Sequence, residues 1–153
     1  MGNNSLFYFK MNYKFNKIYK KWYLIDAKDQ VLGRLSTYVI KILQGKDSPF
    51  YLPYLDTGNY VIIINARQIK VTGRKSSQKI YYSHSSQPGQ LKQETFKKLQ
   101  MRLPKRIIKN SIKGMLSKGR LNKQLLAKLK IYDGQHHPHS AQQPQLLTIK
   151  LKK

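Results

Sequence analysis

Three histidines form the densest group of chemically versatile side chains in the sequence. His136, His137 and His139 lie in the segment IYDGQHHPHSAQQPQ, and the whole chain has four histidines. Imidazole rings bind metals, transfer protons or donate hydrogen bonds to phosphates. However, adjacent side chains of an extended segment point in opposite directions, Pro138 restricts the backbone, and the surrounding charge is positive. We therefore expect polar packing or phosphate contact here, with a zinc or nickel site as the alternative.

The acidic residues are not arranged as in an enzyme. The six carboxylates are spread along the chain, at Asp26, Asp29, Asp47, Asp56, Glu94 and Asp133. No pair has a spacing that suggests shared acid–base work. Asp56 stands in a DTG tripeptide like that of aspartic proteases, but we expect it to form capping or turn hydrogen bonds. Gly33 lacks the companions of a nucleotide-binding fingerprint, so we predict no enzyme activity and no cofactor.

Net charge is the strongest single signal. Thirty lysines and arginines face six acids, which gives a formal charge of +24, and there is no cysteine. Such a chain repels itself unless a polyanion neutralises it. The longest apolar run, residues 60–64, is far shorter than the roughly 20 residues of a membrane-spanning helix. We therefore expect RNA or DNA as the partner and no membrane.

The first half of the chain predicts a β–α–β unit. Residues 22–27 are a short β-prone run, and residues 60–64 are strand formers without polar alternation, typical of a strand buried on both faces. Between them, apolar residues recur at helical spacing, at Leu32, Leu35, Val39, Ile42 and Leu43. Gly45 suits the left-handed position that ends a helix. We expect a right-handed crossover between parallel strands.

The second half predicts two strands, several helices and a late strand. Residues 68–71 and 78–82 are expected strands around an exposed basic loop, residues 72–77. One helix is predicted by Leu91, Thr95, Phe96 and Leu99. Pro104 suits the first turn of the next helix. The last helix is predicted by Leu121, Leu125, Leu126 and Leu129, and a short strand at residues 130–132 follows it.

Basic residues gather at three places in this second half. The helix that Pro104 opens has an apolar face made of Ile107, Ile108, Ile112 and Met115. On another side, Lys105, Lys109 and Lys113 stand four residues apart, a spacing that destabilises an isolated helix unless a polyanion lies beside it. The segments TGRKSSQK and KGRLNK add further cations. These clusters favour a nucleic-acid interface over a surface that is merely solvated.

Five long motifs resemble a known family. WYLIDAKDQVLGRLSTYVIKILQGK, PYLDTGNYVIIINA, VTGRKSSQKIYYSHS, RLPKRIIKNSIKGMLSKG and KLKIYDGQHHPHSAQQP are similar in order and spacing to the bacterial and organellar large-subunit ribosomal protein number thirteen. The resemblance covers residues 22–149. It implies an α/β fold of three layers, with a mostly parallel central sheet flanked by helices. It also implies no enzyme activity, direct binding of large-subunit ribosomal RNA, a role in early subunit assembly, and neighbouring ribosomal proteins as partners. No homo-oligomer is expected.

The resemblance divides the chain into three parts. Residues 22–149 are expected to form the ribosomal protein domain, and residues 150–153 a basic C-terminal tail. Residues 1–21 are expected to be a basic extension, either an RNA-binding tail or a targeting segment. Three short segments depart from the family pattern, at GRLN, TGRKSSQK and HSSQPGQ. Together with AT-rich codon usage, inferred from 24 lysines against 6 arginines, they favour an organelle, a mitochondrion before a plastid, with a bacterial cytoplasm as the alternative.

Basic and histidine side chains throughout the chain are the predicted RNA contacts. The predicted RNA-binding residues are Lys20, Lys21, Arg34, Arg74, Lys75, Lys79, His84, Lys105, Arg106, Lys109, Lys113, Lys118, Arg120, Lys123, Lys128, His136, His137 and His139. A ribosome-independent RNA-binding regulator would share the same charge and remains the alternative function.

Overall fold

The structure is a computed structural model that describes residues 20–49 and 51–149. The predicted tail at residues 150–153 and nearly all of the predicted extension at residues 1–21 lie outside these described residues. Within the described part, no helix has the length and apolar content needed to cross a bilayer.

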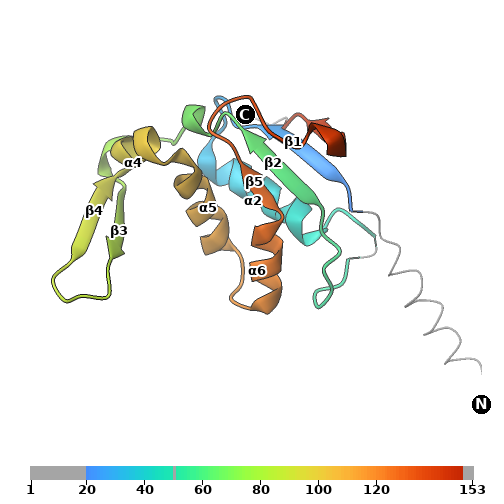
Figure 1. Cartoon of the computed structure of the whole chain (residues 1–153), viewed down its shortest axis with the longest axis horizontal. Coiled ribbons are helices and arrows are strands. Elements are labelled where there is room, and N and C mark those ends of the chain that lie inside the picture. Colours follow the sequence, from blue (N-terminus) through green and yellow to red (C-terminus); the bar gives the residue numbers. More distant parts are fainter. Residues whose placement is uncertain (1–19, 50, 150–153) are drawn as a thin grey trace, which may run out of the picture.

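A four-stranded parallel sheet forms the centre of the fold (Figure 1). Its strands are β1 (Trp22–Asp26), β2 (Tyr60–Ile64), β5 (Leu129–Ile131) and β6 (Gln145–Leu147). Their order across the sheet is β5-β2-β1-β6, so the first strand lies between the second and the last. The predicted α/β class with a mostly parallel sheet is confirmed.

Helix α2 (Leu32–Gln44) connects β1 to its parallel neighbour β2, as the sequence predicts. Gly45 ends the helix with φ of 74°, in the left-handed region that glycine tolerates, and its N–H donates to the carbonyl of Ile42. Residues 56–59 then return to β2 over this helix end. There the N–H of Asn59 donates to the Ile42 carbonyl, and the hydroxyl of Thr57 donates to the Gln44 carbonyl. The DTG segment therefore does cap a helix, but not through Asp56.

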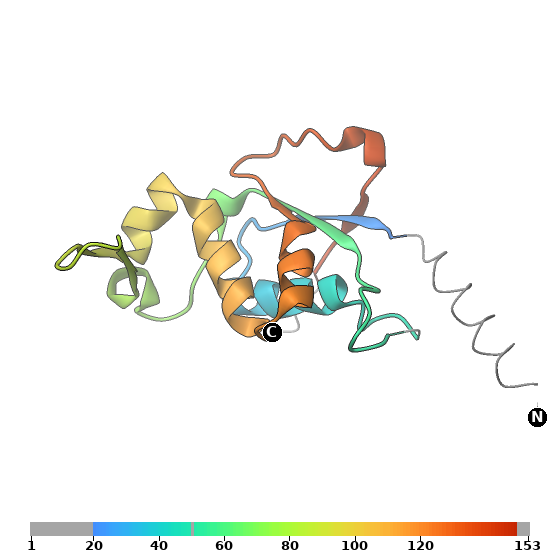
Figure 2. The ribbon, with the colours of Figure 1, turned by 60° about the horizontal axis from the view of Figure 1, so that its bottom comes forward.

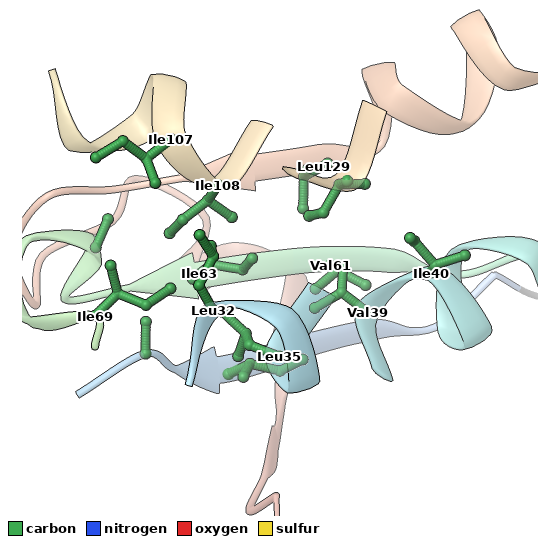
Figure 3. Packing of buried hydrophobic residues seen from close by; sticks show 14 of the residues in the cluster. Leu32, Leu35, Val39, Ile40, Val61, Ile63, Ile69, Ile107, Ile108 and Leu129 are labelled. Carbon is green, nitrogen blue, oxygen red and sulfur yellow. The ribbon is translucent and has the colours of Figure 1, made fainter. Parts of the chain in front are cut away.

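The main core lies between the sheet and the helices on one of its faces (Figure 3). Ile25, Val61 and Ile63 from the strands are fully buried against α2 and against α5 (Pro104–Met115). From the helices, the core receives Leu32, Leu35, Val39, Ile107 and Ile108. Burial of these aliphatic side chains, worth about 1.5–3 kcal/mol each before entropy is counted, stabilises the layer contact.

The opposite face of the sheet lies under the C-terminal segment (Figure 2). This segment runs from Tyr132 through a single 3-10 turn, η2 (Ser140–Gln142), to β6. Trp22, at the start of β1, stacks on Tyr60 with ring centroids 4.3 Å apart. His139 of the covering segment packs on Trp22 at 5.3 Å, so a loop forms the second cover of the sheet.

Most of the remaining elements lie beyond one end of the sheet, whereas α6 (Arg120–Ala127) packs beside α2 and β5 (Figure 1). The elements beyond the sheet are η1 (Ala66–Gln68), α3 (Lys75–Gln78), β3 (Ile80–His84), β4 (Leu91–Thr95) and α4 (Phe96–Arg102). Strands β3 and β4 form a separate antiparallel hairpin that projects from the body.

Four local predictions are wrong. Residues 68–71 form only an isolated bridge between Val31 and Lys70, because no neighbouring strand continues the ladder. Residues 72–77 are not wholly loop, since α3 begins at Lys75. Residues 91–95 form β4 instead of the start of a helix, which begins at Phe96. Met115 lies at the open end of α5 and is 47% exposed, not part of the core.

A substitution at Gly58 tests how closely the 56–59 segment packs on α2. A Cβ atom there would lie 1.6 Å from the backbone carbonyl oxygen of Leu43, which cannot move without disturbing the helix end. We expect Gly58→Ala to lower the free energy of unfolding by about 3 kcal/mol, the cost of overpacking a rigid site. Gly114→Ala is the matched control. A Cβ at Gly114 meets nothing within 4 Å, so alanine should stabilise α5 by about 0.5–1 kcal/mol. Urea unfolding measures the stability of both variants. Equal changes in the two variants would contradict the close approach of Gly58 to the Leu43 carbonyl.

Candidate nucleic-acid interface

Helix α5 presents a cationic side to solvent, as predicted. Ile107, Ile108 and Ile112 are fully buried on its inner side. The exposed cations on the helix are Lys105, Arg106, Lys109 and Lys113. Pro104 occupies the first turn, where its missing N–H costs no helical hydrogen bond. The burial of the isoleucine side therefore holds the cationic side outward.

A groove, which we call the α5–α6 groove, separates α5 from α6. It encloses about 350 Å³ and is lined by Leu103, Lys105, Arg106, Lys109, Leu126, Leu129 and Ile131. Its floor is apolar and its rim is cationic, a combination that accommodates both the sugar or base and the phosphates of a nucleic acid. Lys105 also lies 3.9 Å from Asp133, and its ammonium is 5.7 Å from the ring centre of Tyr132. These contacts hold the lysine near the groove.

A second groove, which we call the α2–α5 groove, lies on the other flank of α5. It encloses about 380 Å³ and is lined by Val31, Leu32, Gly33, Arg34, Val71, Thr72, Lys75, Lys79, Ser111 and Met115. The fold thus brings together Arg34, Lys75 and Lys79, which are up to 45 positions apart in the sequence. Arg74, immediately before α3, is exposed beside them.

Most of the predicted RNA-binding residues lie at the surface. The exposed ones are Lys21, Arg34, Arg74, Lys75, Lys79, His84, Lys105, Arg106, Lys109, Lys113, Lys118, Arg120, Lys123 and His136. Lys118 lies just before α6, Arg120 and Lys123 lie in its first turns, and His84 lies on the projecting hairpin. Lys20, His137 and His139 are partly buried.

Lys128 is a correction to the predicted set. Its side chain is buried at the end of α6, and its ammonium donates to the carboxylate of Asp56 and to the carbonyl of Gly58 at 3.0 Å. Lys20 donates to the other oxygen of the same carboxylate at 2.8 Å. Lys128 therefore holds the 56–59 segment against the sheet and is not available to a nucleic acid. Its sequence surroundings resemble those of the surface lysines, so only tertiary packing distinguishes it.

The Asp56 cluster shifts the ionisation of its members. Burial would raise the pKa of Asp56, but hydrogen bonds from Lys128 and Lys20, with their charges, bring that pKa below its ordinary value. Burial also lowers the pKa of Lys128 to about 8, an effect that its hydrogen bond to Asp56 opposes. Asp56 is thus the shared counter-ion of two lysines, which is a structural role and not the turn hydrogen bonding expected from the sequence.

The histidine segment is held by packing and polar contacts. The hydroxyl of Tyr132 lies 2.9 Å from Nε2 of His139, and the backbone N–H of His139 donates to Nδ1 of His137 at 3.3 Å. His139 also contacts Trp22, while His136 is exposed. Within residues 20–49 and 51–149, no three His, Asp or Glu side chains converge as a metal-ligand group.

Sequence reasoning missed the residues that give both grooves their walls. Leu126 and Ile131 form part of one floor, and Thr72, Ser111 and Met115 line the other groove. The sequence shows these residues only as apolar helix positions or as parts of longer motifs, and it does not indicate that they share a groove, because each groove is assembled from separate elements. Only the cations on the rims had a signal in the sequence, namely their clustering.

The comparisons with known proteins agree on one family. The family model described as ribosomal protein L13 matches residues 20–138. The large ribosomal subunit protein uL13 of Crocosphaera subtropica is 58% identical over 130 residues, covering 85% of this chain and 86% of that protein. Two proteins named large ribosomal subunit protein uL13c are also similar. The one from Porphyra purpurea is 58% identical over 82% of this chain and 89% of its own length. The one from Pyropia yezoensis is 60% identical over 81% and 87%.

The Asp56 cluster generates a stability prediction. Asp56→Asn should lower the free energy of unfolding at pH 7 by about 3 kcal/mol, because it leaves the buried Lys128 ammonium without its counter-ion. The Asp56 pKa is depressed in the folded state, so its contribution is present above its ordinary value of 3.8 and is lost as pH falls through the lower folded value. The variant should therefore lose less stability than the wild type between pH 5 and pH 2. This pH interval brackets the ordinary carboxyl pKa of about 4.

The control for this variant is Asp47→Asn. The Lys41–Asp47 ion pair is exposed, with about half of each side chain accessible, so its loss should change stability by less than about 1 kcal/mol. Urea unfolding across this pH range measures both variants. An Asp56→Asn variant as stable as Asp47→Asn would show that the cluster adds nothing.

The histidine segment generates a second prediction. His139→Ala should lower the free energy of unfolding by about 1–2 kcal/mol, because it removes the ring contact with Trp22 and the hydrogen bond to Tyr132. His136→Ala, at an exposed position, should change it by less than about 0.5 kcal/mol. Thermal and urea unfolding measure the stability of both variants. A larger loss of stability from His136→Ala than from His139→Ala would refute the packing role of His139.

Proposed function

Because the chain belongs to the ribosomal protein L13 family, we propose that it is a structural, non-enzymatic constituent of the large ribosomal subunit that binds ribosomal RNA directly. The observation that supports direct binding is the placement of exposed cations along both flanks of α5. Lys105, Arg106 and Lys109 rim one groove, and Arg34, Lys75 and Lys79 rim the other. Phosphate contacts of this kind supply most of the affinity of a protein for RNA.

The two grooves suggest how the RNA backbone is held. Their rims offer ammonium and guanidinium donors, while their floors offer apolar surface to sugars or unstacked bases. We propose that the RNA crosses α5, with phosphates on both rims, and that Arg74, Lys118, Arg120 and Lys123 extend the contact. Neutralising the cations in this way removes the repulsion along α5, so RNA binding and stability of this helix are coupled.

We further propose a role in early assembly of the subunit. A chain of charge +24 gains most from a polyanion when that polyanion is still accessible, before other proteins cover it. Neighbouring large-subunit proteins would then complete its surroundings. A ribosome-independent RNA-binding regulator is the alternative, and sedimentation with large subunits in high salt distinguishes the two. A regulator would remain in the soluble fraction.

The relatives change the expected compartment. Those reported above are one cyanobacterial protein and two plastid proteins named uL13c, and they give no support to the mitochondrion that the sequence ranked first. We therefore propose a plastid ribosome, with a bacterial cytoplasm as the alternative. Residues 1–21 remain a proposed basic extension beside the domain at residues 22–149.

The α5 cations generate a prediction for RNA affinity. The triple substitution Lys105→Ala, Lys109→Ala and Lys113→Ala should weaken binding to a large-subunit ribosomal RNA fragment. It should also reduce the slope of log K against log salt by about 2, since each lost phosphate contact removes roughly 0.7–0.9. Alanine favours helix, so the fold should be retained.

The matched control removes the same charge elsewhere. Lys28, Lys41 and Lys46 are exposed and lie outside both grooves. Their replacement by alanine should change the affinity much less than the α5 triple does. Equal losses from the two triples, measured by RNA titration at several salt concentrations, would mean that only bulk charge matters.

A further inference from the structure

The projecting hairpin has one face that nothing in the described structure covers. In the β3–β4 register, Ile80 pairs with Thr95, Tyr82 with Gln93, and His84 with Leu91. Side chains two positions apart share a face of a strand, so these six form one surface, which we call the hairpin face. Three of them are large apolar side chains with much accessible surface. Ile80 is 42% exposed, Leu91 is 58% exposed and Tyr82 is 61% exposed.

The other face of the hairpin is already used to attach it to the body. Tyr81 is partly buried against the main core, and burial raises its pKa. Its cross-strand neighbour Glu94 accepts two hydrogen bonds from the guanidinium of Arg102, at 2.6 and 2.9 Å. The N–H of Phe96 donates to the carbonyl of Lys79 at 2.8 Å. The hairpin is thus attached to the body through this face and lies at one edge of the molecule (Figure 2), while the hairpin face stays exposed.

Charge distinguishes this surface from the two grooves that flank α5. Residues 80–96 contain one lysine and one glutamate, so their formal charge is zero, and the remaining residues hold the whole +24. The glutamate is paired with Arg102. A surface that binds RNA needs cations, because phosphate contacts dominate the affinity. The cores of protein–protein interfaces are instead depleted of charge and enriched in tyrosine and other large apolar side chains.

A two-stranded sheet is also marginal by itself in water. This hairpin has support on one face only, and both of its outer strand edges are unpaired within the two-stranded sheet. A partner that covers the hairpin face would remove apolar surface from water and add the second support. The exposed apolar geometry and the lack of net charge therefore both favour a protein partner over RNA.

We propose that the hairpin face docks on an apolar, uncharged surface of a neighbouring protein of the large subunit, while the flanks of α5 bind RNA. This inference rests on the proposed function and assigns its protein-binding surface. Tyr82 is the central contact, with its ring against the partner and its hydroxyl at the edge of the interface, flanked by Ile80 and Leu91. His84, which the sequence placed among the RNA contacts, belongs to this surface and stands apart from the groove cations.

The first test is competition during reconstitution of large subunits from ribosomal RNA and the other subunit proteins. The variant Tyr82→Ser with Leu91→Ser should be incorporated about tenfold less well than the wild type, because it removes two anchors of the interface. Tyr54→Ser with Leu146→Ser is the matched control. It replaces the same residue types at positions that are 75% and 68% exposed, and it should compete as well as the wild type. Equal incorporation of both double variants would overturn the proposal.

The second test identifies the occupant. A photo-crosslinking amino acid in place of Tyr82, in assembled subunits, should form crosslinks to another large-subunit protein, identified by mass spectrometry. Crosslinks to ribosomal RNA, or to a second copy of this chain, would overturn the hairpin-face proposal. The affinity of the free Tyr82→Ser, Leu91→Ser variant for the RNA fragment should equal that of the wild type. The RNA-binding proposal and the hairpin-face proposal therefore fail separately. RNA binding that does not depend on salt would contradict the first alone, and the crosslinking outcomes above would contradict the second alone.

Discussion

Electrostatic self-repulsion is the constraint to which the rest of this structure responds. Five of the six acids lie within ion-pair distance of a lysine or arginine, so the chain has almost no further acid to neutralise its thirty cations. One acid, Asp56, serves two lysines and fixes a loop to the sheet. Many of the remaining cations lie on helices whose inner sides are mostly apolar, so core burial must overcome their repulsion. Compensating charge must therefore come from a partner, and the RNA proposed above would supply it to the same elements that contain the core.

The parts of the fold that the sequence predicted are those set by local chemistry. The β–α–β unit follows from helical and strand periodicity. The end of α2 follows from the left-handed conformation that Gly45 tolerates, and the start of α5 follows from the fit of Pro104 to the first helical turn. In each case the deciding interactions lie within a few residues of one another. The exposure of the α5 lysines follows in the same way, because their spacing places them away from Ile108 and Ile112.

The parts that the sequence did not predict depend on distant neighbours. Residues 91–95 contain good helix formers but pair with β3, and residues 145–147 become a strand only because β1 offers an open edge. Lys128 looks like any surface lysine until Asp56, 72 positions earlier in the chain, is brought beside it. The grooves are likewise products of packing between elements. A single sequence shows which cations are present, whereas the fold decides which of them share a groove.

The strand order has a consequence for synthesis of the chain. Strand β1 is made first, yet its second neighbour, β6, is made last, and the loop that covers Trp22 also follows the helices. Throughout translation the nascent sheet therefore keeps an open edge and one bare apolar face. Both features favour association with other chains at high local concentration. The edge closes only after residues 145–147 have been made, so a product that stops before residue 145 is left with the edge open and becomes a substrate for aggregation or degradation.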